Sequence, residues 1–345
     1  MRYKFYTTSI KAWDGIWSAL NQAQQSIFIE MYIFLDDTNQ THNFLGKLKE
    51  KALAGLKVIV IVDAYGSINL KANIVNELRT AGVEFIFFSR WLKRTHRKLI
   101  LIDEKIAFLG GVNIYKKISH WRDLHVKVQG KVVRPLLRSF AKTYHRCGGR
   151  DETVLVYAKM NVVKKIKAWI LDSWNSADND YNFKHYYQQK IINAQQTIDI
   201  LTPYLLPPRW LLAALDNAVK RGVTVSIIIP QDTDIKVLNR INYINACRLA
   251  DVGVRFYFGK EMNHAKAMII DNKEAIVGSQ NLDLLSFGMN LEIGVFFSHK
   301  QAVETLANIF KTWKQEAVEM DLGFKKLKFF DRIFAFVLRR FVNFF

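Results

Sequence analysis

Two stretches of this sequence place a histidine and a lysine at the same spacing. They are THRKLILIDEKIAFLGGVN (95–113) and NHAKAMIIDNKEAIVGSQN (263–281). The shared positions are His96, Lys98, Asp103 and Asn113 in the first stretch, and His264, Lys266, Asp271 and Asn281 in the second. An imidazole can attack phosphorus or transfer a proton, and an ammonium group attracts the non-bridging oxygens of a phosphate. The residue types therefore predict chemistry on a phosphate group.

Each histidine precedes an apolar run, LILID or AMIID, that is typical of a buried strand. Alternate side chains of a strand share one face, so we expect His96 beside Lys98 and His264 beside Lys266. The pairs Gly110-Gly111 and Gly278-Ser279 would let backbone approach a ligand, and Asn113 and Asn281 would donate hydrogen bonds to phosphate oxygens.

A single His-Lys pair supplies half of an acid-base cycle. Two pairs that meet across a pseudo-twofold supply both halves, because one histidine attacks phosphorus while the other protonates the leaving oxygen. The ordinary imidazole pKa of about 6.5 allows both protonation states at neutral pH. We therefore expect one shared site, with no metal or cofactor, since no cluster in the sequence has the spacing of metal ligands.

The rest of the sequence is duplicated in the same order as the two motifs. AQQSIFIEMYIFLDD (23–37) matches AQQTIDILTPYLLPP (194–208), and AGLKVIVIVDAYGS (54–67) matches RGVTVSIIIPQDTD (221–234). Short β-branched runs alternate with segments of helical periodicity, which predicts an α/β sandwich with a buried sheet in each half.

Three segments follow from this pattern. We expect an N-terminal lobe over residues 1–150, a C-terminal lobe over 151–320 and a tail over 321–345. KMNVVKKIKAWILDSWNS (159–176) is interpreted as an amphipathic helix joining the lobes. The tail is basic, and read as a helix it presents one apolar stripe, which predicts binding to an anionic membrane; a final core helix is the alternative. The stripe consists of Phe324, Leu327, Phe330, Phe334, Leu338, Phe341 and Phe345.

The composition agrees with a globular protein that has anionic partners. Half of the 345 residues are hydrophobic, and 50 Lys and Arg against 31 Asp and Glu give a formal net charge of +19. Two cysteines are too few for a disulfide framework. The N-terminus does not read as a signal peptide, and no run of eighteen apolar residues occurs, so no transmembrane span is expected.

The two motifs, HRKLILID-EKIAFL-GG-VN and HAKAMIID-NKEAIV-GS-QN, resemble the paired HKD motifs of the phospholipase D superfamily, and the resemblance extends to about residue 320. It implies two duplicated α/β/α sandwich lobes, an active site at their interface and a covalent phosphohistidine intermediate. By similarity His96 would be the nucleophile and His264 the general acid and base, although the symmetry of the sequence also permits the reverse.

The remaining residues of the site come from the same resemblance. We count Lys98, Lys266, Asp103 and Asp271 with the catalytic residues, although the aspartates of such motifs mostly serve structure. Asp123 and Glu292 resemble the acids that orient the catalytic imidazoles; an ordinary salt-bridge role is the alternative.

Within the superfamily, bacterial cardiolipin synthases of the short type, without N-terminal membrane spans, are the most similar. The resemblance rests on YIFLDD, GGVNIYKKISHWRDLH, TPYLLPP and NLDLLSFGMNLEIGV. It implies transfer of a phosphatidyl group from one phosphatidylglycerol to another, with release of glycerol, by a peripheral protein on the cytoplasmic face of a bacterial cytoplasmic membrane. Many relatives carry Arg-Ser after the aspartate that follows the second motif, whereas Asp283 here precedes Leu284, Leu285 and Ser286, which leaves the headgroup open.

Three other functions remain as alternatives. A phospholipase D hydrolase would use the same residues with water as acceptor. A nuclease of the superfamily would use the positive charge to follow phosphates, but the amphipathic tail makes nucleic acid the less favoured partner. A non-catalytic membrane scaffold would not need both intact motifs. The oligomeric state stays open.

Overall fold

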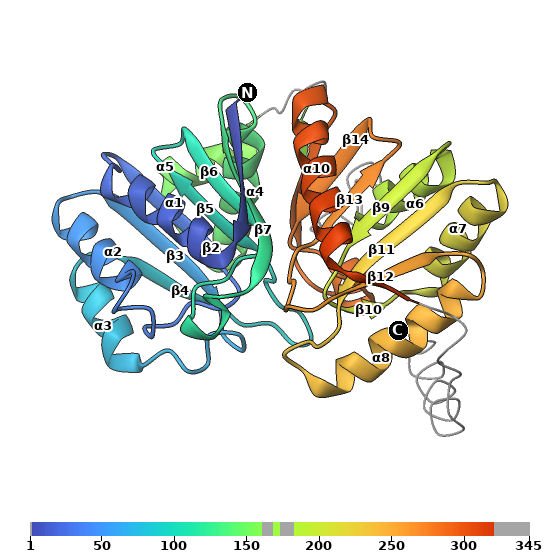
Figure 1. Cartoon of the computed structure of the whole chain (residues 1–345). Helices are drawn as coiled ribbons and strands as arrows, with labels where there is room; N and C mark the ends of the chain where they lie inside the picture. The colour runs from blue at the N-terminus through green and yellow to red at the C-terminus, as the bar shows by residue number, and fades with distance from the viewer. Residues whose placement is uncertain (1, 161–167, 173–182, 321–345) are drawn as a thin grey trace.

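The structure of the chain is a computed structural model, which describes residues 2–160, 168–172 and 183–320. Two mixed sheets face each other, with helices between and outside them (Figure 1). The first lobe contains β1 (Arg2–Thr8), α1 (Ser9–Asn21), β2 (Ser26–Met31), α2 (Phe44–Leu53), β3 (Lys57–Asp63), α3 (Ala72–Thr80), β4 (Glu84–Phe88), β5 (Lys98–Ile102), β6 (Ile106–Gly110), η1 (Lys116–Ile118), β7 (Arg122–Gln129), α4 (Val133–Arg146), α5 (Glu152–Leu155) and η2 (Val156–Lys159). The first lobe therefore extends past residue 150, the expected bound, because the segment that follows α4 packs on it.

The second lobe follows the same order with additional short strands. It contains β8 (Ala168–Asp172), α6 (Phe183–Asn193), β9 (Thr197–Leu201), β10 (Leu205–Leu206), α7 (Arg209–Lys220), β11 (Thr224–Pro230), α8 (Lys236–Ala250), β12 (Arg255–Gly259), β13 (Ala267–Ile270), β14 (Glu274–Gly278), β15 (Leu282–Asp283), α9 (Leu284–Gly288), β16 (Ile293–Phe297), α10 (Lys300–Glu316) and β17 (Val318–Glu319).

The strand orders confirm the predicted α/β duplication. The first sheet runs β1-β7-β6-β5-β2-β3-β4 and the second β17-β12-β11-β9-β13-β14-β16-β8. In each lobe three strands joined through helices are parallel, namely β2, β3 and β4 or β9, β11 and β12. The strands that carry the motifs, β5-β6 and β13-β14, form antiparallel hairpins instead, because only a short turn joins them.

The strands alternate their side chains between an outer and an inner core. In β3, Val58, Val60 and Val62 face α1, α2 and α3, whereas Ile59 and Ile61 face the other lobe. The inner core is shared by both lobes and includes α4 and α10, which lie between the sheets (Figure 1). Helices α6, α7 and α8 cover the outer face of the second sheet. The five layers therefore bury one face of each sheet against the other lobe.

Part of the segment interpreted as a joining helix is a strand, so the helix prediction was wrong there. Ala168–Asp172 pairs antiparallel with β16, the position that β1 holds beside β7 in the first lobe. Backbone pairing at a sheet edge outweighs the helical periodicity of the local sequence. The tail, residues 321–345, lies outside the described residues. No helix in the described parts of the chain is long and apolar enough to cross a membrane.

Candidate active site

The two motif histidines lie just before the start of β5 and β13, two interior strands of the sheets. His96 lies two residues before Lys98, the first residue of β5, which pairs with Met31 at the carboxyl end of β2. His264 lies three residues before Ala267, the first residue of β13, which pairs with Leu201 at the carboxyl end of β9. The site is thus built at the carboxyl ends of the parallel strands, where open α/β sheets commonly place their ligands.

Backbone hydrogen bonds between the lobes hold each histidine beside the opposite half of the chain. The His96 amide donates to the Leu291 carbonyl at 2.9 Å, and the Leu291 amide donates to the Arg94 carbonyl at 2.8 Å. The equivalent pair joins the His264 amide to the Arg122 carbonyl at 2.7 Å, and the Arg122 amide to the Met262 carbonyl at 3.1 Å. The same pattern at equivalent positions of both repeats relates the lobes by a pseudo-twofold.

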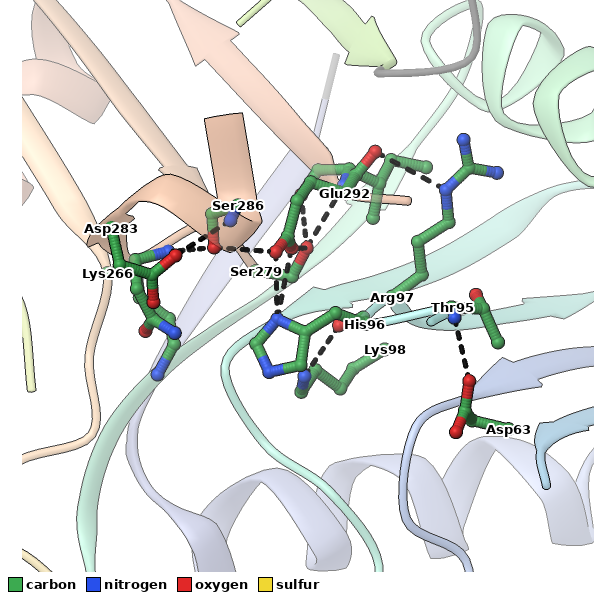
Figure 2. A network of polar contacts seen from close by, with 12 residues as sticks. Asp63, Thr95, His96, Arg97, Lys98, Lys266, Ser279, Asp283, Ser286 and Glu292 are labelled. Atoms are coloured by element: carbon green, nitrogen blue, oxygen red, sulfur yellow. Dashed lines mark hydrogen bonds and ion pairs between the residues drawn. The ribbon is translucent and has the colours of Figure 1, made fainter. Parts of the chain in front are cut away.

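These bridges place a carboxylate from one lobe against the imidazole of the other. Leu291 precedes Glu292, and His96 Nδ1 lies 3.0 Å from Glu292 Oε1 (Figure 2). Arg122 precedes Asp123, and His264 Nδ1 lies 2.9 Å from Asp123 Oδ2. Each carboxylate thus orients an imidazole that comes from the other repeat. An Nδ1–H that donates to a carboxylate leaves Nε2 as the ring nitrogen that can react with a substrate.

The two lysines are buried with the histidines that precede them. Lys98 Nζ donates to the His96 carbonyl at 2.5 Å and lies 5.0 Å from the centre of the Tyr32 ring, and Lys266 Nζ donates to the His264 carbonyl. Burial lowers the pKa of Lys98 well below its ordinary value, and it lowers the pKa of Lys266 to about 8. A site that holds such ammonium groups out of water is stabilised by a phosphate anion.

The imidazoles respond to the same surroundings. Burial lowers the pKa of His96, although the charge of Glu292 opposes this. Burial also lowers the pKa of His264 well below its ordinary value, and the charges of Lys266, Lys98 and His96 lower it further. Because the motif cations of both lobes act on His264, the two motifs share one electrostatic site.

The two carboxylates differ in their protonation. Burial raises the pKa of Asp123 to about 6. Burial also acts to raise the pKa of Glu292, but the charge of His96 and the hydrogen bonds that Glu292 accepts bring it below its ordinary value. Two of these bonds come from Ser279 Oγ and, at 2.8 Å, from Ser286 Oγ (Figure 2). Glu292 is therefore the more firmly ionised of the two acids.

The small residues after each motif make room for the carboxylates. A Cβ on Gly111 would lie 2.0 Å from Asp123 Oδ1, so only glycine fits there. The equivalent position in the second motif is Ser279, which hydrogen-bonds Glu292 instead. The neighbour at Gly111 is thus the orienting acid Asp123, and the approach of the backbone to a ligand at these small residues stays a prediction.

The two asparagines lie beside the histidine strands. Asn113 Oδ1 accepts a hydrogen bond from the backbone amide of Ile33 at 3.1 Å, and the backbone amide of Asn281 donates to Ser286 Oγ at 3.0 Å. Asn281 Oδ1 is buried and has no hydrogen-bond partner among the described residues. Their role in binding phosphate stays a prediction.

Asp103 and Asp271 do not enter the site. They follow the far ends of β5 and β13, so a whole strand separates them from the histidines. Asp103 accepts hydrogen bonds from the amides of Gln24, Gln25 and Ser26, and Asp271 accepts the equivalent bonds from Gln195, Gln196 and Thr197. Both have a left-handed backbone, with φ of 50° and 51°. Counting them with the catalytic residues is therefore corrected: they shape the hairpin turn and tie it to the neighbouring strand.

The sequence interpretation missed a buried polar network behind His96. Arg97 alternates to the opposite face of β5, where its guanidinium donates to Glu30 Oε2 at 3.3 Å and to Thr143 Oγ1 on α4 at 2.9 Å (Figure 2 shows Arg97). Its Nε also donates to the Glu292 carbonyl at 3.3 Å. Ala265 holds the equivalent place in the second motif and lies in the apolar inner core. The one signal of this network in the sequence was that Arg97 stands between His96 and Lys98, whereas alanine stands between the histidine and lysine of the second motif.

Fold and site together define a class of protein, the two-lobed phospholipase D-like enzymes. Residues 16–145 and 187–313 match the family described as cardiolipin synthase, PLD-like domain, and the chain belongs to this family.

Individual relatives agree with this assignment. The chain is 30% identical to the probable cardiolipin synthase YwiE of Bacillus subtilis (strain 168), over 93% of this chain and 68% of the relative. It is 31% identical to a cardiolipin synthase of Geobacillus sp. (strain WCH70), over 91% of this chain and 66% of that protein. The chain thus spans about two thirds of the length of these relatives.

A solved structure has the same fold. The phosphatidylserine synthase of Haemophilus influenzae Rd KW20 superposes with a TM-score of 0.73 at 15% identity, over 92% of this chain and 87% of that protein.

Proposed function

We propose that this chain is a cardiolipin synthase, which transfers a phosphatidyl group from one phosphatidylglycerol to the hydroxyl of a second and releases glycerol. The observation that carries the proposal is the crossed pair of histidine-carboxylate contacts, His96 with Glu292 and His264 with Asp123, beside two buried lysines. The names of the relatives support phospholipids as the substrate class.

In the first half of the reaction, Nε2 of one histidine attacks the phosphorus of the donor. A nitrogen-phosphorus bond forms, and the bond from phosphorus to the oxygen of the glycerol headgroup breaks. The other histidine, which the negative charge of the bound phosphate helps to keep as imidazolium against the effect of burial, gives its proton to that oxygen, and glycerol leaves. Lys98 and Lys266 stabilise the negative charge on the non-bridging oxygens, and Asn113 and Asn281 are the candidate amides for the same oxygens.

In the second half, the neutral histidine takes a proton from a hydroxyl of the second phosphatidylglycerol. The resulting oxygen attacks phosphorus, the nitrogen-phosphorus bond breaks, and cardiolipin is formed. The attacking histidine is neutral again and its partner is protonated, so the cycle is closed.

We assign the role of nucleophile to His96 because its carboxylate partner, Glu292, suits a nucleophile better than Asp123 does. A phosphorylated imidazole is electron-poor, so a firmly ionised carboxylate at Nδ1 stabilises it. Glu292 has the lowered pKa and accepts hydrogen bonds from Ser279 and Ser286, whereas the pKa of Asp123 is raised to about 6. Asp123, which is less firmly ionised, suits His264, the histidine that must give and take a proton.

We also propose that the protein acts at the surface of a bacterial cytoplasmic membrane, on the cytoplasmic face. The formal charge of +19 supports an anionic surface. We propose that residues 321–345 contribute to this binding as a basic amphipathic segment.

The test is incubation of the purified full-length protein with phosphatidylglycerol, with lipid products identified by mass. Cardiolipin and glycerol in equal amounts support the proposal. Phosphatidic acid alone would indicate a hydrolase, and cleavage of single-stranded DNA without lipid turnover would indicate a nuclease. His96→Ala and His264→Ala should each reduce turnover to background at an unchanged melting temperature, whereas His120→Ala, at an exposed position near the site, should retain it. In a rapidly quenched reaction, the phosphatidyl adduct should lie on the peptide that contains His96.

A further inference from the structure

Seven large apolar side chains are exposed along the edge of the two lobes that carries the site. They form what we call the apolar rim: Tyr65, Ile68, Trp91, Leu92, Ile235, Val237 and Leu285. Single exposed apolar residues are common on proteins, but a group around one site indicates an interaction surface.

The topology places these residues on one edge. Tyr65 and Ile68 follow β3, Trp91 and Leu92 follow β4, and Ile235 and Val237 follow β11 or begin α8. The carboxyl ends of these strands lie at the edge where β2 and β9 end and where the histidine strands begin. Leu285, in α9, directly follows the second motif.

Contacts tie the rim to the site from both lobes. In the first lobe the Arg94 guanidinium lies 4.7 Å from the centre of the Tyr65 ring, and Arg94 is two residues from His96. In the second lobe Tyr204, whose ring lies 6.1 Å from that of His264, donates to Asp234, next to Ile235. Ser286, which follows Leu285, donates to Glu292. Rim residues of both lobes are therefore linked through one or two neighbours to the histidines or to their orienting acid.

The most exposed part of the rim is the turn Arg90–Lys93, which immediately precedes the first motif. Trp91 is 89% exposed and Leu92 is 53% exposed, and Leu92 has a left-handed φ of 56°. That conformation is unfavourable for a leucine and persists here at a turn that directs apolar side chains into solvent. Arg90 and Lys93, both exposed, flank the two apolar residues with positive charge.

The opposite edge of the molecule differs. Its exposed apolar residues include Leu53 and Ile192, each near the end of a helix that leads away from the site. They are 68% and 51% exposed, so they match the rim residues in exposure but not in position.

We propose that the apolar rim is the surface through which the protein docks on an anionic bilayer, with Trp91 and Leu92 inserted at the interface and the two histidines facing the lipid phosphates. Tryptophan favours the boundary between headgroups and acyl chains, and flanking basic residues are attracted to anionic headgroups. This inference rests on the proposed function, because a phospholipid whose acyl chains stay in the bilayer can reach His96 and His264 only if that edge faces the membrane.

The test compares two double variants of the full-length protein. Trp91→Ser/Leu92→Asn removes the apolar turn, and asparagine tolerates the left-handed backbone. Leu53→Ser/Ile192→Ser is the matched control at the opposite edge. Cosedimentation with vesicles of phosphatidylglycerol and phosphatidylcholine measures binding, and turnover of a short-chain phosphatidylglycerol below its micellar concentration measures the site without a surface. Loss of two inserted side chains should weaken vesicle binding about tenfold or more.

The proposal expects the rim variant to lose vesicle binding and to keep short-chain turnover, with the control unchanged in both. Unchanged vesicle binding by the rim variant would overturn the proposal, as would an equal loss in the control. Loss of short-chain turnover together with binding would also overturn it, because the turn would then shape the site itself. If the wild type turns over no phospholipid but still needs the rim to bind vesicles, the docking surface stands and the proposed function fails.

Discussion

The acids Asp123 and Glu292 occupy equivalent places in a duplicated site but differ in their surroundings. Glu292 accepts hydrogen bonds from two serine hydroxyls, whereas the backbone amide of Leu124 donates to Asp123 at 2.7 Å. Hydrogen bonds to a buried carboxylate favour its ionised form, so the difference divides the roles of two otherwise similar histidines.

Neutralising either acid should reduce turnover without unfolding the protein. Glu292→Gln and Asp123→Asn keep the size of the side chain but remove the charge that fixes the imidazole tautomer, so we expect kcat to fall on the order of 10³-fold. Steady-state kinetics with phosphatidylglycerol measures this, and Glu304→Gln, an exposed acid on α10, is the control. Near-normal kcat in both site variants would mean that the acids do not orient the imidazoles.

The expected dependence of activity on pH follows from the shifted pKa values of two groups in the site, Asp123 and Lys266. Asp123, with a pKa of about 6, becomes protonated as the pH falls and then no longer accepts the proton of His264 Nδ1. Lys266, with a pKa of about 8, loses its charge as the pH rises and then attracts phosphate less. We therefore expect kcat/KM to be highest between about pH 6 and 8 and to fall on both sides. If kcat/KM continued to rise above pH 8, Lys266 would be excluded as a phosphate-binding cation.

At the scale of the elements, each motif is a hairpin with a reactive end and a structural end. The histidine and lysine stand where β5 or β13 begins, and the aspartate stands where the strand turns back. The aspartate accepts hydrogen bonds from the first backbone amide of the strand that pairs alongside and from the two amides before it, so it fixes the position of the hairpin against the parallel strands.

Removing this cap should affect stability and not chemistry. Asp103→Ala and Asp271→Ala each leave three amides without their acceptor and place alanine at a positive φ, so we expect a loss of about 1–2 kcal/mol in the free energy of unfolding. Urea titration measures the loss, and kcat per folded molecule should stay within about twofold. Asparagine, which tolerates the left-handed backbone, should cost less than alanine. A large fall in kcat at unchanged stability would return the aspartates to the catalytic set.

At the scale of the whole molecule, the lobes share one core and exchange the groups of the site. The inner core joins residues of α4, such as Phe140, to residues of α10, such as Phe310, and to both sheets. Arg122 adds ion pairs to Glu261, at 2.8 Å, and to Glu316. Neither lobe can complete a histidine-carboxylate pair without the other.

The shared core predicts that the lobes unfold together. Phe140→Ala opens a cavity in the inner core and should cost about 3–5 kcal/mol. The midpoint of thermal unfolding, measured by circular dichroism, and the midpoint of activity loss should shift downward by the same amount. Two separate unfolding transitions, in the wild type or in the Phe140→Ala variant, would contradict the single core.

The amino-acid sequence alone determined the duplication, the α/β class and the four residues His96, Lys98, His264 and Lys266. These follow from local patterns, since strand alternation and motif spacing act over a few residues. The helix prediction failed at Ala168–Asp172 because pairing with β16, far along the chain, sets the structure there.

The tertiary structure alone decided which acid meets which histidine, that Asp103 and Asp271 stand outside the site, and that Arg97 is buried behind it. The contacts of the two acids and of Arg97 with the opposite lobe depend on how the two sheets dock, because residues some 140 to 200 positions apart come into contact only when the inner core closes. The place of the two aspartates depends instead on strand pairing within each lobe.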